Sequence, residues 1–485
     1  YANTQAANQG HDALYFIQAK HSDNLMFNMA STLSAKVTKR STLVGGLVLG
    51  SNSNRHYQTM DDLLGASFFH NINTYALGTY PADDPRVQYD LNTAGPNNLG
   101  SLVYEGDKFG YDYKIEVMKG LLWTSYTAEM GRFQTMISGK LGQTNMRRHG
   151  YMRNGMAANN SEGNSRIARF GEGGAKGSIN FDAGKGHVFK IGVGYEWRPP
   201  MANAAFISPE ICNDYVLNLG DEHVFSSEFS YQYQNAWVHA NVNAYYSRLD
   251  HVTEWQNFYN DDENSFTYLS MTGLEKEYYG IEAGLDFKVA SFLNFKAIGT
   301  ISDAKNINNA NVNYMLSKSA EVKKDYAYIK DMRESGTPLT IGSLALDFHK
   351  SGWFVNLNAN WYDRIYLSYS PSYRYKSSLK NRDMLFNDEP LPGSVDQAKG
   401  HGGWMVDGSI GKSIRLKHGS LNFNLMITNI LNNRKIVSGG YEQSRSDYTL
   451  NKENEAKDRV YKFSKNPKKY YVFGTNGMFQ VSYRF

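Results

Sequence analysis

The sequence is poor in several features that would place it in a common class of protein. Its 485 residues include one cysteine, Cys212, so no disulfide can form within the chain, and 11 prolines that form no linker. No apolar run approaches the roughly eighteen residues of a membrane-spanning helix. The formal charge is +4, from 51 Lys and Arg against 47 Asp and Glu. This small excess, without a basic stripe, disfavours nucleic acid as a partner. One large domain over residues 1–485 is therefore allowed.

Alternation of apolar and polar residues with a period of two is the dominant positive signal. Aromatic residues make up 14% of the chain, and many of them stand at every second position. Four clear runs are 236–244, 353–361, 421–427 and 473–485. Runs of about ten to eighteen residues exceed the strands of a soluble sandwich and match tilted strands that cross a bilayer.

The links between these runs alternate between short and long. Short links fall near 38–40, 128–131, 181–186, 234–235, 290–292, 351–352 and 417–419. Long polar links fall near 58–110, 150–170, 198–222, 254–273, 304–339, 370–403 and 432–472, with a short helix allowed near 319–331. The pattern predicts an all-β fold, a transmembrane antiparallel up-and-down β-barrel with long extracellular loops and short periplasmic turns.

About sixteen strands are expected, and because unpaired backbone groups are costly in lipid, the sheet has to close without an edge. It closes either with further strands from a longer polypeptide or, as the competing hypothesis, with these sixteen strands alone. The alternative is a large soluble all-β protein such as a propeller. A propeller requires a repeat of roughly forty residues with a shared signature, and none is found.

Motifs of enzymes and metal sites are missing from the sequence. There is no Cys/His metal spacing, no glycine-rich phosphate loop after a strand and no Gly-x-Ser-x-Gly turn. We therefore expect no enzyme activity, no catalytic residue, no cofactor and no metal. Cys212, without a nearby base, is expected to be an inert thiol.

Aromatic side chains in the long loops are the candidates for substrate binding. They are Trp255, Tyr259, Tyr369, Tyr373 and Tyr441. Such rings combine a large contact area with a hydrogen-bonding tip, which suits sugars, peptides and aromatic chelators. The alternative is the aromatic girdle that such barrels carry at the membrane interface.

Several short motifs, in their order and spacing, carry a resemblance to a known family. They are GYEWRPP at 194–200, TNILNN at 428–433, GGYEQ at 439–443 and the terminal VSYRF at 481–485. With them, the chain resembles TonB-dependent outer-membrane receptors, and among these it is most similar to receptors of the Bacteroidota.

The resemblance implies a bacterial outer-membrane barrel in contact with outer-membrane lipids, which imports a scarce solute such as an oligosaccharide, peptide or metal chelate into the periplasm. It also implies a TonB complex acting through an N-terminal region, and a surface lipoprotein of the SusD-like kind as a partner. The resemblance further implies a twenty-two-stranded barrel that is closed by a plug. We expect the plug and the first strands to lie before Tyr1. The alternative function is a platform barrel that binds surface lipoproteins without transport.

Overall fold

A computed structural model describes residues 3, 11–95, 100–260, 263, 265–319, 321–443 and 467–485. Within these residues, one sheet joins eighteen strands. In the same part of the chain, no helix is long and apolar enough to cross a membrane.

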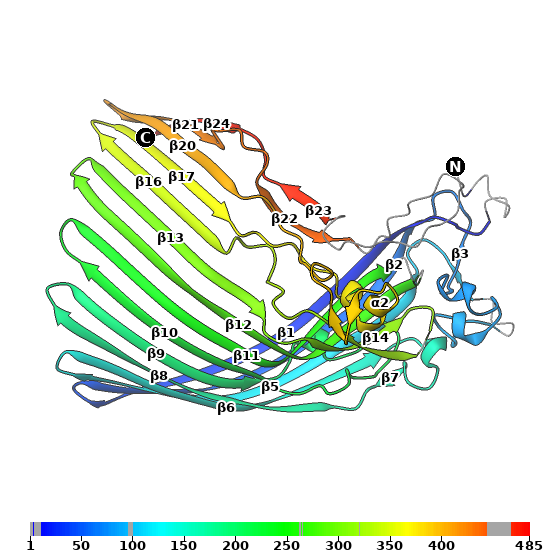
Figure 1. Ribbon diagram of the computed structural model, residues 1–485. Helices are drawn as coiled ribbons and strands as arrows, with labels where there is room; N and C mark the ends of the chain where they lie inside the picture. The colour runs from blue at the N-terminus through cyan, green and yellow to red at the C-terminus, as the bar shows by residue number, and fades with distance from the viewer. Residues whose placement is uncertain are drawn as a thin grey trace.

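Fifteen long strands form the wall, each antiparallel to its neighbours (Figure 1). In order around the sheet they are β1 (Ile17–Thr38), β2 (Ser41–Asp62), β5 (Lys108–Met130), β6 (Phe133–Gly150), β8 (Ala168–Gly184), β9 (His187–Arg198), β10 (Glu222–Gln234), β11 (Val238–Asn260), β12 (Ser265–Ala290), β13 (Leu293–Asn306), β16 (Thr340–Lys350), β17 (Trp353–Asp363), β20 (Gly403–Leu416), β21 (Gly419–Thr428) and β24 (Asn476–Arg484). The expectation of about sixteen was one strand too many within the described residues.

Shorter elements lie in the long loops. β7 (Gly163–Asn164), β14 (Ala310–Leu316) and β15 (Val322–Ala327) complete the large sheet. Three two-stranded sheets pair β3 (Phe69–His70) with β4 (Leu102–Val103), β18 (Leu385–Phe386) with β19 (Glu389–Pro390), and β22 (Val437–Glu442) with β23 (Pro467–Tyr471). The helical turns are η1 (Ala76–Gly78), η2 (Pro85–Val87), η3 (Gly155–Ala157), η4 (Ala202–Ala204), η5 (Pro371–Arg374) and α2 (Lys376–Lys380).

The register of the wall confirms the predicted faces. Phe423 pairs with Val481 and Asn424 with Gln480, so apolar residues share one face and polar residues the other. Val481 is 51% exposed, and the apolar face is turned away from the lumen. Because lipid solvates apolar side chains, exposure of this face is what a transmembrane barrel requires. The fold class predicted from the sequence is confirmed.

The tight turns also fall where the sequence places them, but two of the long links hold more strand than expected. β11 continues to Asn260 and β12 begins at Ser265, so most of the predicted loop 254–273 is regular strand. The segment 319–331, where the sequence allowed a short helix, contains β15 instead.

The two ends of the wall remain unpaired within the described residues. β1 pairs with β2 alone, and β24 pairs with β21 alone. Figure 1 shows the sheet curling from β1 to β24 without joining them. The described residues therefore do not form the closed sixteen-stranded sheet of the competing hypothesis.

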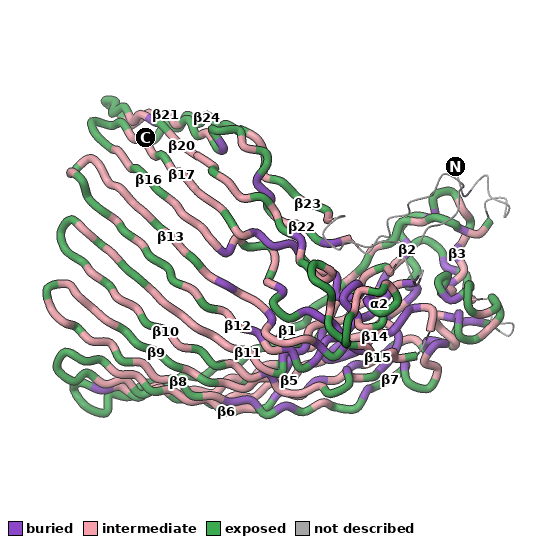
Figure 2. The backbone as a smooth tube through the Cα atoms, in the orientation of Figure 1, coloured by how far each residue is buried: buried purple, intermediate pink, exposed green. Residues whose placement is uncertain are grey.

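The buried residues gather at the extracellular ends of the wall strands and in the loops beyond them (Figure 2). There β11 and β12 extend past the wall and pair onward with β14 and β15, forming a four-stranded cap sheet. One face of the cap sheet carries Leu269, Met271 and Val312 in one core. The other carries Tyr268 and Met315 in a second core, together with residues of three other loops. The cap sheet thus forms the centre of the extracellular region.

Candidate functional site

Two of the predicted binding aromatics lie on the same face of the cap sheet. Trp255 pairs with Ser270 and Tyr259 with Phe266, and Tyr268 occupies the position between these two pairs on the same face. Tyr259 is 36% exposed, and its ring lies 6.1 Å from the ring of Tyr75 in the loop after β2. We call Trp255, Tyr259, Tyr268 and the adjoining Tyr75 and Glu210 the aromatic face.

Glu210 reaches this face from the loop 199–221. The Tyr268 hydroxyl donates a hydrogen bond to Oε2 of Glu210 at 2.6 Å. Among the described residues, no cation forms an ion pair with Glu210. A carboxylate that already accepts one phenolic proton retains acceptor capacity for donors of a ligand.

Arg148 on β6 holds the loop in this position. Its fully buried guanidinium donates to the carbonyl of Pro209 at 2.7 Å, to the carbonyl of Ser161 at 2.7 Å and to Oδ1 of Asn213 at 2.6 Å. Because Pro209 directly precedes Glu210, these bonds fix the backbone from which the carboxylate projects.

The same loop enters the mouth of the lumen. On β5, exposed Met118 and Leu122 face outward at even positions, so Tyr113 at an odd position faces inward. Ala205 and Phe206 of the loop pack against Tyr113 in one core. The aromatic face therefore lies at the extracellular opening of the barrel.

The surroundings of Glu210 shift its ionisation. Burial raises the pKa of the Glu210 carboxyl above its usual value, against the weaker opposing effects of the Tyr268 hydrogen bond and the charge of Lys20. In the loop after β2, burial also raises the pKa of Tyr89, and the charge of Glu210 adds to that shift. Both shifts favour the uncharged form, so this region disfavours further negative charge.

Two further polar atoms near the aromatic face lack a hydrogen-bond partner among the described residues. They are Nε1 of Trp255 and Oγ of its cross-strand neighbour Ser270. Buried polar groups are normally satisfied, so each of these two atoms has an unmet hydrogen-bonding capacity. The arrangement offers stacking surfaces, one carboxylate and hydrogen-bonding groups.

The other three predicted aromatics lie elsewhere. Tyr369 packs against the core on the opposite face of the cap sheet. Tyr373 is 2% exposed and lies in a small core with Tyr328 and Leu379. Tyr441 is on β22, with its ring 6.4 Å from that of Tyr470. The structure thus brings together Trp255 and Tyr259, but not the remaining three.

Sequence reasoning missed Glu210, Tyr268 and Tyr75. Glu210 lies within the long link predicted near 198–222, but its contact with Tyr268 joins residues 58 positions apart. No local pattern reports a contact of that kind. Within the described residues there is no group of three or more His, Cys, Asp or Glu side chains that could hold a metal ion.

A buried ion pair fastens the last extracellular loops to each other. Arg374 of η5 donates to Glu442 of β22 through both terminal nitrogens, at 2.6 and 2.9 Å. The Glu442 carboxylate also accepts the backbone N–H groups of Ser370 and Ala398. Arg374 is 0% exposed and Glu442 5% exposed, so this pair is removed from water.

The wall has counterparts among solved structures. The copper transporter OprC matches with a TM-score of 0.61 and 10% identity, over 99% of this chain and 59% of that one. The fold is that of a TonB-dependent receptor barrel. The ferric citrate transporter FecA, in its unliganded form, matches with a TM-score of 0.58 and 9% identity, over 96% of this chain and 55% of that one. The FrpB iron transporter from Neisseria meningitidis matches with a TM-score of 0.55 and 10% identity, over 96% of this chain and 56% of that one.

The chain therefore spans less than 60% of the length of these three structures. At such low identity, the likeness to TonB-dependent receptor barrels concerns the fold. No protein-family model and no curated protein matches the chain.

Proposed function

We propose that this chain forms the wall and extracellular cap of a bacterial outer-membrane transporter that imports a scarce solute. A TonB complex supplies the energy in this proposal, acting on a plug and further strands that belong to the same polypeptide. The likeness to the barrels of the copper transporter OprC and the ferric citrate transporter FecA supports the proposal, and so do the two unpaired strand edges, which need partners in lipid. A Bacteroidota source and a SusD-like surface lipoprotein are also parts of the proposal.

The observation that carries the proposal is the aromatic face at the barrel mouth. This face suits a solute with hydroxyl or amino groups. It carries the exposed ring of Tyr259, the carboxylate of Glu210 and the indole N–H of Trp255, which has no partner among the described residues. An oligosaccharide or a peptide fits this chemistry better than a strongly anionic metal chelate, because the Glu210 carboxylate has no paired cation among the described residues. Binding by Tyr369, Tyr373 and Tyr441 stays a prediction.

Uptake by cells that produce the full polypeptide tests this function. We expect the double change Trp255→Ala and Tyr259→Ala to lower uptake of at least one probe among labelled maltoheptaose, a labelled tetrapeptide and ferric citrate by about tenfold. The control Phe386→Ala removes an exposed aromatic side chain from another loop and should leave uptake unchanged.

The alternative function is a platform barrel that binds surface lipoproteins without import. It predicts no uptake of any probe by the parent, and loss of lipoprotein copurification when the extracellular loops are shortened. Uptake that is lost in the double variant while lipoproteins still copurify favours transport.

A further inference from the structure

A group of cations projects from the outer surface of β2, β5, β6 and β8, just above the lipid-facing band. Toward the extracellular end, the outward pair Leu122 and Leu141 is followed by Met118 with Asn145 and then by Glu116 with Arg147. Leu122 and Leu141 are 63% and 65% exposed, as side chains that face acyl chains are. The charged residues therefore begin where the apolar band ends, at the level of lipid headgroups.

The cations exceed the acids in this group. Five cations belong to it, namely Arg55, Lys108, Lys114, Arg147 and Arg169, and we call them the outward basic patch. Four carboxylates share the surface, Asp23, Asp61, Asp112 and Glu116. Five positive against four negative groups leave an excess of one positive charge.

Asp112 and Glu116 on β5 each already pair with two cations. Asp112 accepts from Arg55 at 2.6 Å and lies 3.4 Å from Lys108. Glu116 pairs with Lys114 at 2.7 Å and also with Arg147. One carboxylate cannot neutralise two cations, so each of these groups of three side chains keeps a net positive charge that attracts a further anion.

Arg169 has no ion-pair partner among the described residues. It is exposed, and its cross-strand neighbour Asn145 shares the outward face with Met118. Aromatic rings complete the surface, because the Arg55 guanidinium lies 4.2 Å from the ring centre of Tyr151 and Lys108 lies 4.1 Å from that of Tyr57. Arginines held on rings present their N–H groups in fixed directions, which suits phosphate oxygens.

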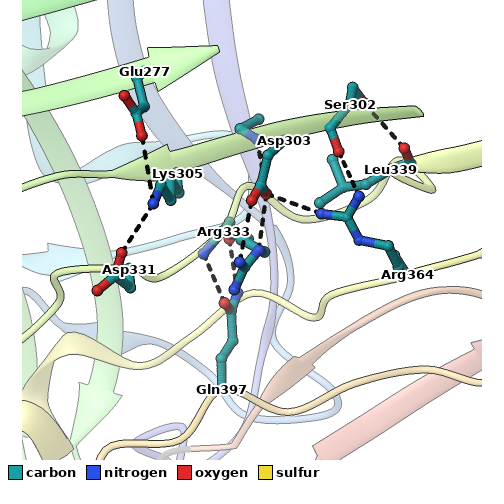
Figure 3. Close-up of polar contacts among 10 residues, drawn as sticks. Glu277, Ser302, Asp303, Lys305, Asp331, Arg333, Leu339, Arg364 and Gln397 are labelled. Carbon is teal, nitrogen blue, oxygen red and sulfur yellow. Dashed lines mark hydrogen bonds and ion pairs between the residues drawn. The ribbon is translucent and has the colours of Figure 1, made fainter. Parts of the chain in front are cut away.

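At the same level of the wall, the outer surface of β11 to β13 carries more acidic than basic side chains. Its members, the β13 cluster, are Arg248, Lys305, Arg333 and Arg364 with Asp250, Glu275, Glu277, Asp303 and Asp331. Figure 3 shows Asp303 between Arg333 and Arg364, and Lys305 between Glu277 and Asp331. Four cations against five carboxylates leave no positive excess, so the positive surface is confined to one side of the barrel.

We propose that the outward basic patch binds the phosphate groups of a lipid in the outer leaflet. The occupant is a membrane-anchored phosphorylated glycolipid, since the patch borders the apolar band and its charge is complementary to phosphate. Acyl chains of that lipid lie against Leu122 and Leu141, and its phosphates face Arg147 and Arg169. This inference concerns the outer surface and does not depend on solute import.

Titration of the full chain with lipid tests the inference. The protein, in detergent micelles, is titrated with bisphosphorylated lipid A, and the bound lipid is counted by native mass spectrometry. We expect Arg169→Gln to weaken binding about fivefold, the usual effect of one cation at an anionic lipid surface. Arg248→Gln, which removes the same charge from the β13 cluster, should change binding less than twofold.

The arms of the experiment separate lipid from other anions. Binding should fall at high salt, should be lost when the lipid A is dephosphorylated, and should not be displaced by equimolar inorganic phosphate. Equal binding of the dephosphorylated lipid, displacement by free phosphate, or equal effects of the two variants would overturn the inference. So would loss of a copurifying acidic lipoprotein from Arg169→Gln with unchanged lipid affinity. Heat-dependent migration of each variant on gels checks that its barrel is folded.

Discussion

In the wall, adjacent residues of one strand face lipid and lumen in turn, whereas in the cap, residues far apart in the sequence share one interior. Phe423 and Asn424 are neighbours with opposite surroundings. Asn73, by contrast, donates a hydrogen bond to the carbonyl of Ser317, 244 positions away. The wall is thus specified by local alternation, and the cap by contacts between loops. The two regions should therefore respond differently to substitution.

The largest difference is expected for Arg374→Met in the cap. The change leaves the buried carboxylate of Glu442 without its cation, which typically costs about 3–5 kcal/mol. Hydrogen exchange should accelerate in 366–370 and in β22 while β21 and β24 stay protected. Adding Glu442→Met should restore part of the protection. Faster exchange that spreads evenly into the wall strands would contradict the idea that the cap and the wall respond separately to substitution.

A charge placed on the lipid face tests the wall. Phe423→Arg should obstruct assembly, since a cation near the membrane midplane costs about 2–4 kcal/mol, while Asn424→Arg should assemble normally. The folded fraction is measured by heat-dependent migration on gels. Equal damage from both variants would refute the assignment of the two faces.

A smaller effect should follow from Glu210→Gln. The pKa of Glu210 in the folded protein lies above its usual value of 4.5, so ionisation of this carboxyl disfavours the folded cap. The parent protein therefore loses stability as pH rises from 4.5 through the raised pKa. The glutamine variant does not titrate. Its cap should therefore resist proteolysis better than the parent at neutral pH and equally at pH 4. A constant difference at all pH values would show that this carboxyl does not control the cap.

The smallest effect is expected for modification of Cys212. The thiol is buried, and burial raises its pKa to about 11, so the thiolate is scarce at neutral pH. Maleimide labelling at pH 7.5, followed by mass spectrometry, should be slow in the folded protein and fast after unfolding in urea. Rapid labelling of the folded protein would show that the loops of the cap open.

The sequence predicts the wall well because alternation is a property of neighbours. The runs 353–361 and 421–427 became β17 and β21 with the expected faces. In the loops that signal weakens. The segment 319–331 has no clear period, and β15 forms there because it can pair with β14.

The candidate site was predictable only in part. Aromatic density drew attention to Trp255 and Tyr259, which do share a face. The same criterion selected Tyr373, whose ring helps to fill a small core. Composition indicates which side chains can bind a ligand, but burial decides which of them remain accessible. Glu210 has no distinguishing neighbour in the sequence, and its importance comes from Arg148 and Tyr268.

The unpaired edges of the wall impose a rule of parity. The fifteen wall strands found in the described residues alternate in direction, so β1 and β24 run the same way across the membrane. An antiparallel cylinder can be completed from such a start only by an odd number of additional strands, because the first and the last must both run opposite to these edges. One additional strand, three or seven satisfy the rule, whereas two or six would force a parallel seam.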